Sequence, residues 1–282
     1  MTFYGRWLKA QGLGVRAQGS GVLRIICALG MMSATTLEAG QAAPAARPPA
    51  QNRQATPDLS GYWLGSYFVG LQNIETAKGV IVDPPDGKIP YLPEVRARAT
   101  DIRANRMADE PELHCFMSGV PHVMYVQFGF QIIQNPRQVV MAWDFMNAFR
   151  IIATDGRPHI PASIKLFQGD SVGRWEGGTL VVDTTNQNDR TWLDTAGNIH
   201  SDAIHVVERF TLADPNTIRY EATIDDPKAF AAPWKATETF RRIATPDYEQ
   251  YEFACIEGNR DLQHYPEQAG GKAKAQPPQT SQ

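Results

Sequence analysis

Apolar and polar side chains alternate strictly in several stretches of this chain, and the alternation limits the fold more than any other feature. Residues 122–133 place every second residue, from Met124 to Ile132, on one apolar face. Residues 137–145 and 216–224 repeat the pattern. Because successive side chains of a strand point to opposite faces, these stretches predict half-buried antiparallel strands.

Short turn signals connect the predicted strands. They are Asn135-Pro136, Asp155-Gly156, Gly177-Gly178 and Asp214-Pro215-Asn216. Glycine supplies positive φ angles and proline presets the turn, so consecutive strands are expected to pair as hairpins. One helix is predicted from Pro93 to about Met107, where proline stands at the first turn and apolar residues follow at helical spacing.

These elements predict an all-β, mainly antiparallel fold with one inserted helix. An open meander of roughly nine or ten strands would leave unpaired edges, so the strands must close or stack. We expect an up-and-down meander that closes into a barrel resembling the lipocalin and calycin group. A β-sandwich is the alternative.

The ends of the chain differ in composition from its centre. Residues 1–42 combine basic residues, a short apolar run and small residues around Ala42, which is typical of a cleaved secretory signal. Residues 43–57 and 266–282 are rich in Pro, Ala and Gln and are predicted to be disordered. A single β-barrel domain is expected over residues 58–265, exported to the periplasm or beyond.

Charge and cysteine content narrow the partners and the compartment. The formal net charge is −3, and removing a basic signal segment makes the mature chain more acidic. Nucleic acid and anionic membranes are therefore not expected as partners, whereas a small molecule is. Signal cleavage leaves Cys115 and Cys255, and an oxidising compartment favours a disulfide between them over two buried thiols.

Several motifs resemble a family of secreted bacterial proteins for which no activity is established. The similarity covers most of the mature chain and is carried by SVGRWEGGTLVVD, NDRTWLD, HSDAIHVVERF and TIDDPKAF, which begin at Ser171, Asn188, His200 and Thr223. DLSGYW and ACIEGNRD extend it toward the two ends. The resemblance implies export but assigns no catalytic residue. Gly178 departs from the family pattern, in which an acid commonly follows Trp-Glu-Gly.

The stretch HSDAIHVVERF poses the question of which face of its strand matters. Its hairpin with residues 216–224 buries apolar side chains on one face only if Asp202 and Glu208 also point inward and His205 points outward. Glu238 likewise shares a face with apolar residues of the next predicted strand. Because a buried carboxylate must be paired, solvated or protonated, each of the three is a candidate site residue.

The inward acids leave three functions open. The first is a secreted binding protein whose barrel encloses a small amphipathic molecule, with candidate contacts from Arg150, Arg190, Trp192, Tyr220, Trp234 and Phe240. The second is a lyase, isomerase or hydrolase in which Glu208, Glu238 and Asp202 are acid/base candidates. The third is a structural envelope-associated protein. A purely structural Glu–Arg network is an equally simple explanation of the inward acids.

No cofactor motif occurs, and no metal site is expected. His200, His205 and Glu208 resemble a ligand set, but His200 and His205 would point to opposite faces of one strand. The sequence contains no phosphate-binding loop and no His-Glu-X-X-His or Gly-X-Ser-X-Gly motif.

Overall fold

The computed structural model describes residues 56–66, 73–126, 128–251, 253 and 255. All of them belong to one compact unit, Gln51–Gln282. The predicted signal segment, most of the predicted linker and the predicted tail lie outside the described residues.

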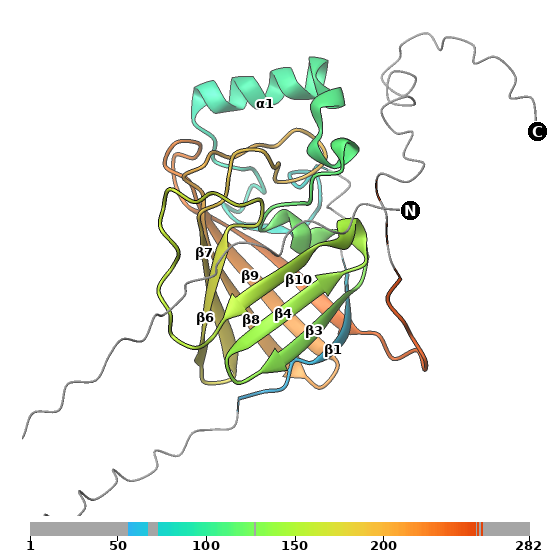
Figure 1. Cartoon of the computed structure of the whole chain (residues 1–282). Coiled ribbons are helices and arrows are strands. Elements are labelled where there is room, and N and C mark those ends of the chain that lie inside the picture. Colours follow the sequence, from blue (N-terminus) through green and yellow to red (C-terminus); the bar gives the residue numbers. More distant parts are fainter. Residues whose placement is uncertain (1–55, 67–72, 127, 252, 254, 256–282) are drawn as a thin grey trace, which may run out of the picture. The chain divides into compact units, whose positions relative to one another are not determined.

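Nine strands form a closed barrel, which confirms the predicted fold class (Figure 1). The barrel runs in the order β1, β3, β4, β5, β6, β7, β8, β9 and β10, and β10 pairs back with β1. Their bounds are β1 (Gly61–Gly65), β3 (Phe130–Asn135), β4 (Gln138–Trp143), β5 (Phe149–Ala153), β6 (Asp170–Glu176), β7 (Thr179–Thr185), β8 (His205–Asp214), β9 (Thr217–Asp225) and β10 (Trp234–Arg242). A further strand, β2 (Ile81–Asp83), pairs with the first part of β10.

One pair of neighbouring strands breaks the expected meander. β5 and β6 are parallel, with Ile152 opposite Ser171, whereas all other pairs are antiparallel. A parallel pair needs a long connection that returns the chain to the end where the first strand began. Residues 154–169 provide it, so the turn predicted at Asp155-Gly156 starts a crossover and not a hairpin.

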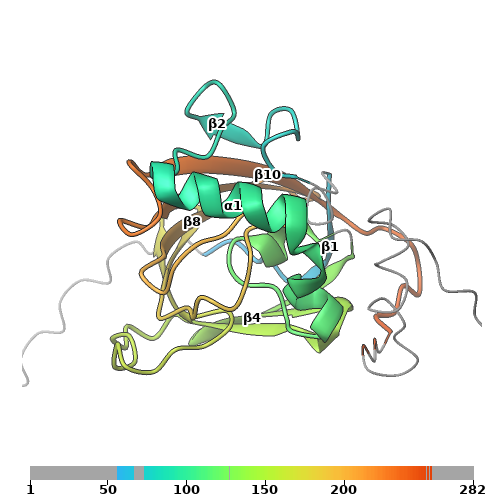
Figure 2. The same ribbon diagram turned by 90° about the horizontal axis from the view of Figure 1, so that it is seen from above.

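The predicted helix is present as α1 (Pro93–Asn105) and lies across one end of the barrel (Figures 1 and 2). Ala99 and Ile102 are its buried residues. Arg103 Nε donates to the Ala196 carbonyl at 3.0 Å and so ties the helix to the loop between β7 and β8. We call this end, with α1 and the connections 186–204 and 226–233, the helix end.

Residues 122–126, 128 and 129 do not form the strand that their alternation predicts. The chain instead makes a 3₁₀ helix, η4 (His122–Tyr125), and pairing begins only at Phe130. All four residues of η4 are buried, so alternation does not separate a buried face from an exposed one here. The prediction was wrong because burial from all sides looks, in sequence, like part of an apolar strand.

The predicted disulfide is present. Cys115 follows the 3₁₀ helix η3 (Pro111–His114) and is bonded to Cys255, with 5.7 Å between the two Cα atoms. The bond joins the segment after α1 to a segment 140 residues later in the chain.

The hydrophobic core lies inside the barrel. The register of the last three strands is the predicted one, because Glu208 lies opposite Ala222 and Ala222 lies opposite Ala236. Every second side chain of these strands points inward, and all of these inward side chains are buried. They are found at alternate positions from Val206 to Phe210, from Ile218 to Ile224 and from Trp234 to Phe240. The inward acids Glu208 and Glu238 therefore lie within the core, as predicted.

Candidate functional site

A buried ion pair occupies the inside of the barrel. Glu208 on β8 is 0% exposed, and Arg150 reaches it from β5 with both terminal nitrogens. Arg150 Nη1 donates to Glu208 Oε1 at 2.9 Å, and Arg150 Nη2 donates to the other oxygen. This bidentate geometry is the arrangement in which a guanidinium best compensates a buried carboxylate.

Hydroxyl groups complete the surroundings of this ion pair. Tyr220 donates to Glu208 Oε1 at 3.0 Å, and Thr184 donates to Oε2 at 3.3 Å. Arg150 Nε donates to Ser171 Oγ at 2.9 Å. Each carboxylate oxygen therefore has at least two donors, which matches the Glu–Arg network considered from sequence and leaves Glu208 poorly suited to proton transfer.

Glu238 on β10 has a different environment. Its Oε1 accepts the backbone N–H groups of Ser66 at 3.0 Å and Thr239 at 2.6 Å. The carboxylate also lies beside Gly65, where a Cβ would be in ordinary contact with Oε2 at 3.5 Å. Glu238 is thus held by the backbone where β1 ends, and Glu208 by an arginine across the barrel.

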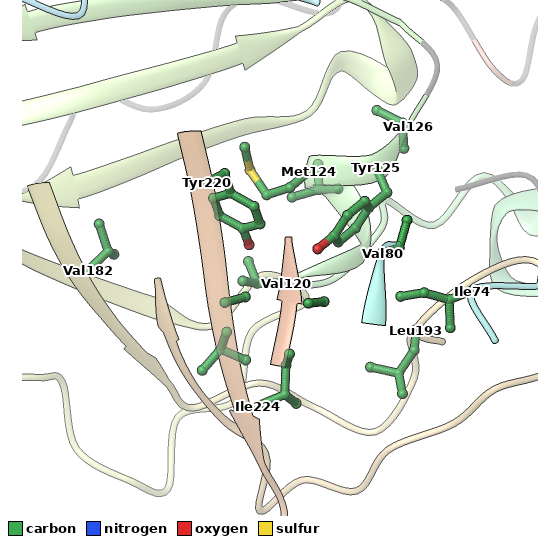
Figure 3. Packing of buried hydrophobic residues seen from close by; sticks show 14 of the residues in the cluster. Ile74, Val80, Val120, Met124, Tyr125, Val126, Val182, Leu193, Tyr220 and Ile224 are labelled. Carbon is green, nitrogen blue, oxygen red and sulfur yellow. The ribbon is translucent and has the colours of Figure 1, made fainter. Parts of the chain in front are cut away.

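Tyr125 places a hydroxyl in the same interior. Gln187 fixes the chain before η4, because its side chain bonds both the N–H and the C=O of Val120 at 2.8 Å. Gly119 permits this approach, as a Cβ there would lie only 2.9 Å from Gln187 Oε1. Figure 3 shows the hydroxyls of Tyr125 and Tyr220 pointing into the same part of the core.

The Tyr125 hydroxyl has no hydrogen-bond partner within the described part of the chain. The residue is 1% exposed, so water does not reach it from outside. Burial, followed by the negative charges of Glu238 and Glu208, raises the pKa of Tyr125 well above its usual value. The group therefore stays protonated, and a buried donor left without an acceptor is costly.

The barrel interior also contains a second buried donor and two small side chains. Trp234 Nε1 on β10 also has no partner among the described residues. Trp234 is opposite Ile224, which Figure 3 shows beside the region that the tyrosine hydroxyls point into. Ala222 and Ala236 fill the positions next to Glu208 on β9 and β10. The interior thus combines small side chains with unpaired donors.

Three predicted site residues do not lie inside the barrel. Asp202 is in the turn before β8, with a side chain 46% exposed and paired to Lys228 at 2.8 Å, because the strand begins only at His205. Arg190 is exposed and stacks over the Phe116 ring at 4.5 Å. Trp192 is buried in the β7–β8 connection at the helix end, bridged to Ile199.

The remaining predicted contacts, Tyr220, Trp234 and Phe240, line the interior as expected from the register. The ring centroids of Tyr220 and Phe240 are 5.7 Å apart. The order of strands in the barrel could not be predicted from the sequence, so Arg150 and Arg190 were equally good candidates for the partner of Glu208. The structure brings only Arg150 to Glu208.

The histidines of HSDAIHVVERF are separated, but not as opposite faces of one strand, because β8 begins only at His205. His205 points outward, and its Nε2 lies 3.0 Å from Asp183 Oδ1. His200 is buried at the helix end, with Nε2 2.8 Å from Thr191 Oγ1. Across the described residues, no group of three or more His, Cys, Asp or Glu side chains is placed to hold a metal ion.

A cluster of buried acids that was not predicted lies in the segment after α1. Glu110 is 4% exposed and Glu112 is 7% exposed, and Glu112 Oε1 lies 3.7 Å from His122 Nε2 and accepts from Ser118 Oγ. Burial, and then the charge of Glu112, raises the pKa of Glu110 to about 7. Glu110 caps the short 3₁₀ helix η3 and Glu112 lies within it, in a segment too short to show a periodic sequence pattern, so sequence reasoning missed both residues.

No helix in the described part of the chain is long and apolar enough to span a bilayer. No family model matches the chain. No curated protein matches it either. The function must therefore be inferred from the residues themselves.

Proposed function

We propose that this protein binds a small amphipathic molecule inside its barrel, next to the Arg150–Glu208 pair. The observation that carries the proposal is the Tyr125 hydroxyl, a fully buried donor without a partner among the described residues. Most buried polar groups in proteins are hydrogen-bonded, and exceptions often mark a site that another molecule completes. Aromatic walls with a few placed polar groups are typical of small-molecule sites.

Access to such a site runs through the helix end. The aromatic residues Trp63, Phe130 and Phe240 fill the barrel at the levels where β1 pairs with β3 and β10, and all are at most 2% exposed. The helix end is closed by loops and short helices, which open more readily than a sheet. A ligand that passes η4 would meet the Tyr125 hydroxyl first.

We also propose that the protein is exported to the periplasm or the cell exterior. Residues 1–42 have the composition of a cleaved signal segment. The Cys115–Cys255 disulfide supports this location, because such bonds persist in oxidising compartments.

Native mass spectrometry of the protein purified without denaturation tests the binding proposal. We expect an adduct of small-molecule mass that is lost on denaturation. Glu238→Gln and Tyr125→Phe should reduce its occupancy, whereas His205→Ala, which changes the outer face, should not. A spectrum of the bare chain alone, or an adduct lost only in His205→Ala, would contradict the proposal.

Proton transfer is a second candidate function, favoured by Glu110 and not by Glu208. A carboxyl with a pKa of about 7 is present in both protonation states near neutral pH, as a general acid or base requires. If the bound molecule is converted, the rate should follow one ionisation near neutral pH in the native protein and lose it in Glu110→Gln. A rate unaffected by Glu110→Gln would exclude this role.

A further inference from the structure

Two polar side chains inside the barrel lack a partner among the described residues, and each carries a hydrogen to donate. Tyr125 carries one O–H, and the Trp234 indole carries an N–H that can only donate. The acceptors without a partner among the described residues are on Glu110, Asp144 and Gln168, none of which points inward from a barrel strand. In the described interior, the hydrogens of the Tyr125 hydroxyl and the Trp234 indole therefore both lack an acceptor.

The charges around Tyr125 act against an anionic group. Glu238 and Glu208 are the charged residues that, after burial, raise the pKa of Tyr125, so the potential at its oxygen is negative. A carboxylate at this position would be repelled by the Glu238 carboxylate in a medium of low dielectric constant. Arg150 largely cancels the charge of Glu208, but both of its terminal nitrogens already bind that carboxylate, so it is not free to pair with a second anion.

A cationic group fits the donors no better. An ammonium has three donors and no acceptor, so it leaves the Tyr125 and Trp234 hydrogens unsatisfied. It must also lose its hydration to enter a core where Ala222 and Ala236 are 0% exposed. An uncharged acceptor satisfies a donor at a small desolvation cost.

We infer that the ligand presents an uncharged hydrogen-bond acceptor, such as the carbonyl oxygen of an ester or ketone, to the Tyr125 hydroxyl at one end of an apolar body. This inference rests on the proposed binding function and specifies the chemical class of the ligand. Its apolar body would lie against the small side chains of Ala222 and Ala236 and the aromatic walls of the barrel.

Calorimetric titration with four probes of similar chain length tests the inference. The probes are methyl octanoate, octanol, octanoate and octylamine. Methyl octanoate should bind most tightly, and octanoate and octylamine at least about tenfold more weakly. Tyr125→Phe should weaken methyl octanoate about five- to tenfold, which is the usual effect of one lost hydrogen bond.

Tyr248→Phe is the matched control, because it removes a hydroxyl that lies 3.3 Å from Asp144 Oδ2, outside the barrel interior. It should leave all four affinities unchanged. Tighter binding of octylamine or octanoate, or an ester affinity equal in Tyr125→Phe and the native protein, would overturn the inference while the binding function stands. Failure of all four probes to bind would count against the binding function itself.

Discussion

Replacing Glu110 by Gln should stabilise the protein at mildly alkaline pH and remove part of its pH dependence. Glu110 is buried, and its Oε2 accepts the Leu113 N–H at 2.9 Å while Oε1 has no partner among the described residues. Glutamine keeps the shape and an acceptor oxygen but carries no charge. The change therefore isolates the cost of ionising this carboxyl inside the protein.

The magnitude follows from proton linkage. Burial and the Glu112 charge raise the pKa of Glu110 from 4.5 to about 7. At about 1.4 kcal/mol per pKa unit, this shift corresponds to about 3 kcal/mol. Because the folded state binds the proton more tightly, this stabilisation is complete below about pH 4.5 and is lost as the pH rises through about 7.

Denaturant unfolding at a series of pH values from about 4 to about 8 measures the effect. The difference in unfolding free energy, Glu110→Gln minus native, should rise by about 3 kcal/mol between the two ends of this range. In a Glu112→Gln variant that keeps Glu110, the loss of stability with rising pH should occur at lower pH than in the native protein. The reason is that this substitution removes the second cause of the raised pKa of Glu110. Glu94→Gln, on the exposed side of α1, is the matched surface control for the substitution itself.

A flat difference curve for Glu110→Gln would refute the reasoning. It would mean that the Glu110 carboxyl is solvated or paired in the folded protein at all pH values. A curve that falls with pH would show that the ionised form is the one the fold stabilises.

Three further outcomes are expected. Arg150→Met should lower the free energy of unfolding by about 3–5 kcal/mol, because it leaves Glu208 buried without its arginine. Adding Glu208→Leu should restore most of this loss, and a double variant as unstable as Arg150→Met alone would contradict the reasoning. Reducing the Cys115–Cys255 bond should cost up to about 5 kcal/mol, given its 140-residue separation, and unchanged denaturation midpoints would argue against that cross-link. His205→Ala should change stability by less than about 1 kcal/mol, because its side chain is 42% exposed; a loss as large as that of Arg150→Met would place it in the core.

The face of each strand was predictable because a strand has a period of two residues. Once Val206 and Phe210 must be buried, Glu208 between them has to share their face, and the same argument places Glu238 between Ala236 and Phe240. The disulfide was predictable from the number of cysteines left after the signal segment. The helix α1 was predictable from its proline start and apolar spacing.

The ends of strands were less predictable, as Asp202 and η4 show. Asp202 follows the alternation of β8, yet Ser201 binds Asp226 with its backbone N–H and its hydroxyl, and the chain turns there. A polar contact 25 residues away thus ended the strand, and no local pattern records it. The apolar run of η4 likewise enters the core from the helix end instead of joining the sheet.

The sequence by itself determined that two carboxylates enter the core, because hydrophobic burial fixes the register of neighbouring hairpins over a few residues. It did not determine what each carboxylate meets there. Arg150 reaches Glu208 across 58 residues of chain, and Tyr125 lies near both glutamates only because η4 leaves the sheet and enters the barrel. Those contacts depend on barrel closure and on the order of distant strands, which follow from the packing of the whole domain and not from the period of any one strand.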